Sequence, residues 1–139
     1  MVFRKRGKLH PNERWTYNGH IIEVVDNFNY LGTVFNYTGN FSLNQENLIG
    51  KALKAMYTLL SKCNMLDLKP SILCQLFDAF VGSILNYSSV VWGFSKSKEI
   101  KRVHLKFCKR ILEVRLNACN NQVYGELGRY LFLSTIQPH

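Results

Sequence analysis

The chain has 139 residues, of which 47% are hydrophobic and 19% are charged, and its formal net charge is +9 at pH 7. This length is typical of one domain with a substantial core, and the composition excludes an intrinsically disordered chain. The charge balance favours polyanionic partners, nucleic acid first and an anionic membrane surface second, although basic soluble proteins are common.

The basic amino-terminal sequence MVFRKRGK is not followed by an apolar run, which excludes a secretory signal peptide. We therefore expect an intracellular protein, in the nucleus or the cytoplasm, and not a secreted one. Residues 70 to 95 carry a single charge, but polar side chains interrupt them well short of a transmembrane span. A buried helix is expected there, and no membrane partner.

Residues 1–41 are expected to form a small antiparallel β unit. Residues 1–4 and 14–17 are predicted strands, and Asn18-Gly19 is the strongest short signal for a type I′ hairpin turn. The return strand is predicted over residues 20–25. FNYLGTVF, residues 28–35, is predicted as one further strand with alternating faces.

Residues 42–130 are expected to form a helical domain, which makes the predicted fold class α+β, and residues 131–139 a disordered tail. Ser42 and Gln45 resemble a capping box that starts a helix ending near residue 64. A second helix is predicted from Pro70 to Leu85, followed by a connector over residues 86–94. The predicted core side chains of these two helices are Ile49, Leu53, Met56, Leu60, Cys63, Leu73, Leu76, Phe77, Phe80 and Ile84.

A third helix is predicted over residues 97–115, and a short last helix over residues 121–127. Five cations of the third helix fall within an arc of roughly 120°, opposite its apolar side: Lys98, Arg102, Lys106, Lys109 and Arg110. Such a face suits contact with a phosphate backbone, where each contact releases counterions. A solvated outer face of a helical bundle remains the more frequent explanation of this pattern.

The residues offer little catalytic chemistry. The nine Asp and Glu residues are never adjacent, whereas two-metal phosphoryl transfer needs carboxylates held close together. His104 and Cys108 are spaced i, i+4, but a structural zinc site needs four ligands, and the four cysteines form no CxxC pair. We expect no enzymatic activity, no metal and reduced, buried thiols. Trp15 and Trp92 could stack on bases, although core positions are commoner for tryptophan.

The segments GHIIEVVDNFNYLGTVF, LNYSSVVWG, LKFCKRILEV and NNQVYGELGR follow one another in this order. Their order and spacing resemble the region after the palm of non-LTR (LINE-type) retrotransposon reverse transcriptases, from residue 1 to about residue 130. The resemblance implies that residues 1–4 are the last strand of the palm, that the aromatic-Leu-Gly block is the primer grip, and that the helices correspond to the thumb. The implied primer-grip residues are Phe28, Tyr30, Leu31 and Gly32.

The resemblance further implies a piece of an RNA-directed DNA polymerase that binds template-primer, as RNA/DNA hybrid or duplex, without catalysis of its own. The Tyr-x-Asp-Asp loop is absent, so Mg²⁺ would belong to the parent polymerase, whose palm and fingers would be the missing partners. Tyr87-Ser88-Ser89-Val90 departs from the Tyr-Gly-Ser-Glu of relatives. An alternative is a helical protein-interaction remnant with no nucleic-acid function.

Overall fold

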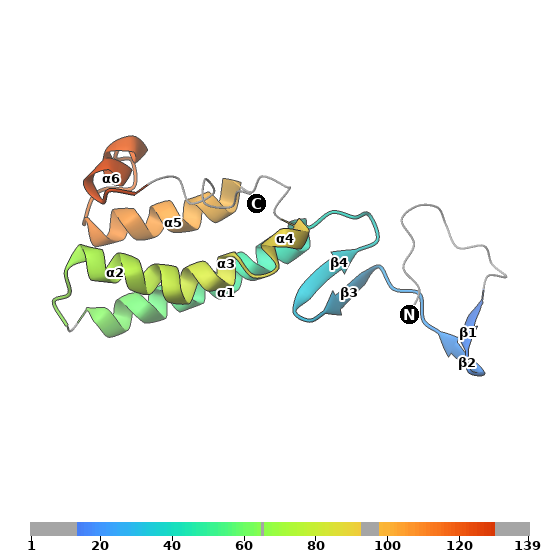
Figure 1. The fold of residues 1–139 in the computed structure, drawn as a ribbon. Helices are drawn as coiled ribbons and strands as arrows, with labels where there is room; N and C mark the ends of the chain where they lie inside the picture. Colours follow the sequence, from blue (N-terminus) through green and yellow to red (C-terminus); the bar gives the residue numbers. More distant parts are fainter. Residues whose placement is uncertain (1–13, 65, 93–97, 130–139) are drawn as a thin grey trace. The chain divides into compact units, whose positions relative to one another are not determined.

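The computed structural model describes residues 14–64, 66–92 and 98–129. The chain divides into two compact units, residues 1–44 and residues 45–139, whereas the predicted boundary followed residue 41. Four short strands precede a series of helices (Figure 1), so the α+β fold class is confirmed. The predicted strand at residues 1–4 and the predicted tail at residues 131–139 lie outside the described residues.

The first hairpin pairs β1 (Trp15–Tyr17) with β2 (His20–Ile22) around Asn18-Gly19. Both turn residues have positive φ, 49° and 80°, which confirms the predicted hairpin turn. The strand β2 ends three residues earlier than predicted. Trp15 is 45% exposed, so its assignment to the core is wrong.

The second hairpin replaces the single strand that was predicted over residues 28–35. Strand β3 (Asn27–Tyr30) pairs with β4 (Thr33–Asn36), and the register places Phe28 opposite Phe35. Leu31 and Gly32 form the two-residue turn, with φ of 48° and 81°. The alternation of faces shifts by one residue at this turn, since the paired Tyr30 and Thr33 share a face. Leu31 gives no turn signal, which is why the segment was predicted as one strand.

Asparagine side chains connect this hairpin to the first helix. Oδ1 of Asn40 accepts hydrogen bonds from the backbone N–H and the hydroxyl of Ser42, at 2.9 and 2.7 Å. Oδ1 of the buried Asn44 accepts the backbone N–H of Val34 at 3.0 Å. Local hydrogen bonds of this kind suit Asn at turns and helix starts, so the asparagines of this segment have a structural use.

Among the described residues, the helical unit contains three long helical segments and two short helices. The three long segments lie alongside one another (Figure 1). The second segment, from residue 70 to residue 85 as predicted, changes from α to π-helix and back without interruption. Part of the predicted connector is helical instead. The bounds are α1 Ser42–Cys63, α2 Pro70–Phe77, π-helix η1 Asp78–Gly82, α3 Ser83–Leu85, α4 Ser89–Trp92, α5 Lys98–Ile111 and α6 Asn120–Glu126.

Helix α5 ends four residues earlier than predicted. Glu113, two residues beyond its end, has φ of 53°, a backbone conformation that a right-handed helix cannot contain. The predicted start at residue 97 lies outside the described residues. The segment that follows Ile111 therefore does not continue along the axis of α5.

The core of the helical unit is apolar and contains stacked aromatic rings. The rings of Phe77 and Phe107 stack with centroids 4.2 Å apart and join α2 to α5. Of the predicted core residues, Met56 and Phe77 are buried, whereas Phe80 is 60% exposed. The buried apolar side chains of the three long segments are Leu48, Ala52, Met56, Cys74, Phe77, Val81, Leu85, Ile100, Val103, Phe107 and Cys108.

All four cysteines are free, but only Cys74 and Cys108 are buried. Cys63 is half-buried and Cys119 is exposed, so the expectation of burial for all four is wrong. Among the described residues, no helix combines the length and the apolar character needed to cross a bilayer.

Candidate nucleic-acid interface

Helix α5 carries an exposed row of cations, which we call the α5 basic line: Lys98, Arg102, Lys106 and Arg110. Its members are spaced i, i+4, so their Cα atoms follow one another along the helix at intervals of about 6 Å. The whole line spans about 18 Å, the rise of about five base pairs along one strand. An exposed ion pair joins Arg102 to Glu99, and such a pair contributes little to stability.

Lys109 does not belong to this line, and the prediction that it is exposed is wrong. Its side chain is 5% exposed, and its Nζ donates a hydrogen bond to the backbone carbonyl of Leu116 at 2.6 Å. The chain turns back after α5, where the backbone N–H of Val114 donates to the carbonyl of Lys109. The helical angle placed Lys109 with the other cations, but the following segment covers it.

Lys106 joins the α5 basic line to helix α1. Its Nζ lies 5.3 Å from the centroid of the Tyr57 ring, within the range of a cation–π interaction. Tyr57 is 48% exposed, so the interaction lies at the surface. The outward side chains of α1 add three further exposed cations, which are Lys51, Lys54 and Lys62.

A cleft lies where α1 ends and α5 ends. Its volume is about 1040 Å³, at the upper end of the range for small-molecule pockets. Helix α1 contributes Tyr57 and Ser61 to its lining, Asn64 follows the end of α1, and α5 contributes Arg110. The last cation of the α5 basic line therefore belongs to the wall of this cleft.

The predicted primer-grip residues lie together at the tip of the second hairpin. Tyr30 and Leu31 are 57% and 74% exposed, whereas Phe28 is half-buried. The rings of Phe28 and Tyr30 share one face, with centroids 6.1 Å apart. Gly32 permits the positive φ of the turn, so its local structural use is established independently of any ligand.

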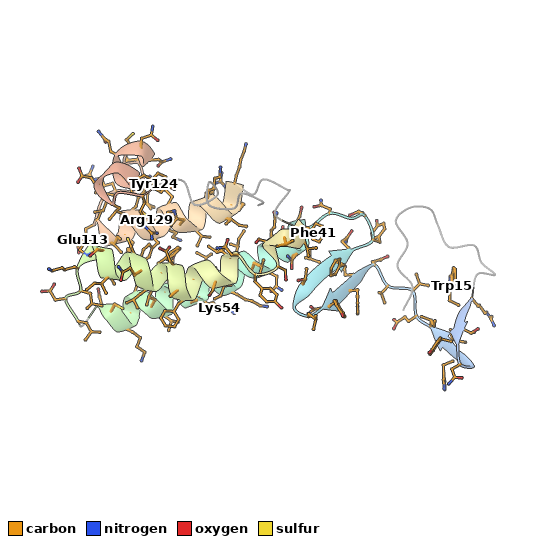
Figure 2. All side chains as sticks on the ribbon, viewed as in Figure 1. Trp15, Phe41, Lys54, Glu113, Tyr124 and Arg129 are labelled. Carbon is orange, nitrogen blue, oxygen red and sulfur yellow. The ribbon has the colours of Figure 1, made fainter. Side chains whose placement is uncertain are left out.

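A polar cluster lies inside the helical unit, and we call it the Arg129 cluster: Cys74, Asp78, His104, Cys108, Tyr124 and Arg129. The guanidinium of Arg129 forms an ion pair with Asp78 and donates to Nε2 of His104 at 2.9 Å. It also donates to the backbone carbonyl of Cys74 at 3.4 Å. Figure 2 shows Arg129 and Tyr124 where α6 meets α5, and the rings of Tyr124 and His104 stack.

The chemistry of the Arg129 cluster is structural. Burial, aided by the charge of Arg129, lowers the pKa of His104 from 6.5 to about 4, so the ring is neutral at physiological pH. Burial raises the pKa of Cys108 to about 12, and its Sγ lies 3.6 Å from Nε2 of His104. A protonated thiol beside a neutral imidazole that accepts from Arg129 is not an activated nucleophile.

Within the part of the chain that the structure describes, no group of three or more His, Cys, Asp or Glu side chains is placed to hold a metal ion. His104 and Cys108 do approach each other, as their spacing predicts. Sequence reasoning missed Arg129 and Asp78, because 51 residues separate them and neither belongs to a motif. It also missed Tyr57, an exposed residue of α1 that belongs to no motif.

No family model, curated protein or solved structure matches the chain. The geometry and charge of the described residues are therefore the observations on which a function is proposed.

Proposed function

We propose that this chain binds template-primer nucleic acid, as RNA/DNA hybrid or duplex, in the manner of the thumb region of a LINE-type reverse transcriptase and without catalysis of its own. The observation that carries the proposal is the α5 basic line, four exposed cations in a row on one helix. The length of the α5 basic line allows contact with several consecutive phosphates of one strand. Neutralisation of these phosphates would release counterions, and this release would drive binding.

Two further features support this proposal. The cations of α1 increase the positive field beside α5, and the whole chain carries +9. The second hairpin holds the side chains of Tyr30 and Leu31 out into solvent at its tip. Exposed aromatic and apolar side chains at a rigid turn suit contact with the end of a nucleic-acid strand, the role that the resemblance implies for them.

The proposal predicts a steep salt dependence. We expect the logarithm of the affinity for a blunt RNA/DNA hybrid to fall linearly with the logarithm of salt concentration. Four phosphate contacts on B-form DNA correspond to a slope of about −3.6, and a hybrid should behave similarly. Fluorescence anisotropy of a labelled hybrid measures this slope, and a flat line would contradict the proposal.

Charge removal locates the interface. Lys106→Gln and Arg110→Gln should each weaken binding for every sequence tested and reduce the slope by about 1. Arg115→Gln is the matched control, since Arg115 is exposed and lies beyond the end of α5. Equal effects of all three variants would show that net charge alone, and not the α5 basic line, governs binding.

One observation favours the alternative of a protein-interaction module. Apolar side chains on the outward side of α2, η1 and α4 are solvent-exposed, namely Ile72, Phe80, Val90 and Val91. Exposed apolar groups mark protein contacts when they form a continuous patch. A flat salt dependence together with loss of a protein complex in Phe80→Ser would support this alternative against nucleic-acid binding.

A further inference from the structure

The cleft at the end of α5 combines features that the phosphate contacts of the α5 basic line do not require. Tyr57, an aromatic residue of α1 that is 48% exposed, lines this cleft. Ser61, one helical turn further along α1, and Asn64, the residue after the end of α1, add a hydroxyl and an amide to the lining. Helix α5 contributes Arg110 to the lining.

These groups match the parts of a nucleotide. An exposed aromatic ring stacks on any base, because every base has a π face. The hydroxyl and the amide both donate and accept hydrogen bonds, as the edges of bases do. Arg110 can bind a phosphate with two parallel hydrogen bonds. The ammonium group of Lys106 lies 5.3 Å from the centroid of the Tyr57 ring.

The charged residues of the cleft decide which part of the nucleotide contacts which group. Asp67 and Glu113 line the cleft and are exposed, and Lys109, which also lines it, is buried and donates its Nζ to the carbonyl of Leu116. Carboxylates repel a phosphate but accept hydrogen bonds from the exocyclic amines of bases and from sugar hydroxyls. The base and sugar therefore suit contact with Asp67 and Glu113, and the phosphate suits contact with the exposed Arg110.

We propose that this cleft receives an unpaired nucleotide next to the duplex held by the α5 basic line, with its base stacked on Tyr57. This inference rests on the proposed function, since the duplex positions the single strand. Because Arg110 belongs both to the basic line and to the cleft wall, a strand that follows the line reaches the cleft at the end of the helix. The chain would then distinguish a duplex end with an overhang from a blunt end.

The experiment compares three labelled RNA/DNA hybrids by fluorescence anisotropy at one salt concentration. One is blunt, one has a short single-stranded overhang with 2-aminopurine as its first base, and one has an abasic overhang with the same phosphates. We expect the base-containing overhang to bind about tenfold more tightly than the abasic one, as one stacked base contributes about 1–3 kcal/mol. Stacking should also quench the fluorescence of 2-aminopurine.

Variants assign the effect to the ring. Tyr57→Leu keeps an apolar side chain and should abolish both the tenfold preference and the quenching, whereas Tyr57→Phe should retain them. Tyr37→Leu is the control, because Tyr37 is similarly exposed, at 42%, and lies in the other unit. Circular dichroism confirms that each variant is folded.

The possible failures are distinguishable. Failure to bind the blunt hybrid overturns the proposed function and this inference with it. Equal affinity for the base-containing and abasic overhangs, with the blunt hybrid still bound, overturns this inference alone. Retention of the preference in Tyr57→Leu, or its loss in Tyr37→Leu, also overturns it.

Discussion

Leu31 adopts a backbone conformation that its own side chain disfavours. Its φ is 48°, and the left-handed region costs a residue other than Gly about 1–2 kcal/mol. Asn18, at the equivalent position of the first hairpin, has φ of 49°, but Asn tolerates this region through local hydrogen bonds. Strain at an exposed apolar residue motivates the hypothesis that Leu31 is held there for a contact.

Replacement of Leu31 by Asn tests this hypothesis. Leu31→Asn should stabilise the second hairpin by about 1 kcal/mol, since Asn-Gly is the preferred type I′ turn. It should also weaken hybrid binding if the Leu31 side chain contacts the nucleic acid. Hydrogen exchange at Thr33 and Phe35, whose N–H groups face the paired strand, measures the first effect. Fluorescence anisotropy measures the second.

The reverse substitution is the control. Asn18→Leu should destabilise the first hairpin by a similar amount and leave hybrid affinity unchanged. If amide exchange slows in Leu31→Asn and hybrid affinity is unchanged, the Leu31 side chain does not contact the nucleic acid, and the hypothesis is wrong.

At the scale of single residues, a structural feature can be predicted from the sequence when a short motif encodes it. Asn18-Gly19 predicted a turn because both residues favour positive φ, whereas Leu31-Gly32 contains only one such residue and was assigned to a strand. Lys109 was misassigned for another reason. Its helical angle is that of an exposed residue, and only the backbone after Ile111, which no periodicity describes, buries it.

At the scale of elements, Arg129 fastens the short helix α6 to the bundle. A seven-residue helix has too few turns to be stable alone, so its tertiary contacts must hold it. The backbone N–H of Arg129 donates to the carbonyl of Tyr124, and its guanidinium contacts α5 and the segment from α2 to η1. Asp78, the first residue of the π-helix, supplies the carboxylate.

Removal of the guanidinium should release α6. We expect Arg129→Met to lower the free energy of unfolding of the helical unit by about 2 kcal/mol, within the range for hydrogen bonds to charged groups. Screening at the half-exposed Asp78 carboxylate makes a larger loss unexpected. Amide exchange at Val123 and Tyr124 should accelerate more than exchange in α5, which distinguishes local release from global loss.

The same change at an exposed arginine is the control. Arg115→Met should alter neither the stability nor the exchange of α6. Uniform acceleration of exchange throughout the helical unit in Arg129→Met would show that the Arg129 cluster supports the core and not α6 in particular.

Helix positions were predictable because caps, periodicity and proline encode them locally. The start of α1 at Ser42 and of α2 at Pro70 are examples. The buried face of the segment from α2 to α3 was predicted only in part. Of the predicted stripe, Phe77 is buried, Phe80 is exposed, and the others, Leu73, Leu76 and Ile84, are half-buried. Phe107 of α5 stacks on Phe77, and no local pattern describes this contact between helices.

At the scale of the whole molecule, charge and core chemistry act on stability in different ways. The net charge of +9 destabilises the folded state through repulsion between like charges, and this repulsion grows as pH falls and carboxylates lose their charge.

His104 makes a separate contribution to the pH dependence of stability, because its ring is buried in the Arg129 cluster. The groups that face it are Asp78, Arg129, Tyr124 and the thiols of Cys74 and Cys108. The net charge can be counted from the sequence, but no local pattern places His104 beside Arg129, 25 residues away.

His104 should therefore make stability fall in mild acid. Its pKa is 6.5 in the unfolded chain and about 4 in the folded one, so between these values the unfolded state binds more protons. Stability is full above pH 6.5 and declines as pH falls towards 4, by about 3 kcal/mol in total. Urea denaturation at a series of pH values measures this decline for the helical unit.

Two glutamine variants separate this contribution from general charge repulsion. His104→Gln keeps an acceptor for Arg129 but cannot take up a proton, so its stability should change little between pH 6.5 and 4 apart from the decline common to all variants. His20→Gln removes an exposed histidine of β2 and should retain the wild-type pH dependence. If the wild-type and His104→Gln curves run parallel across this range, protonation of His104 is not coupled to unfolding, and the acid sensitivity of the chain comes from its carboxylates.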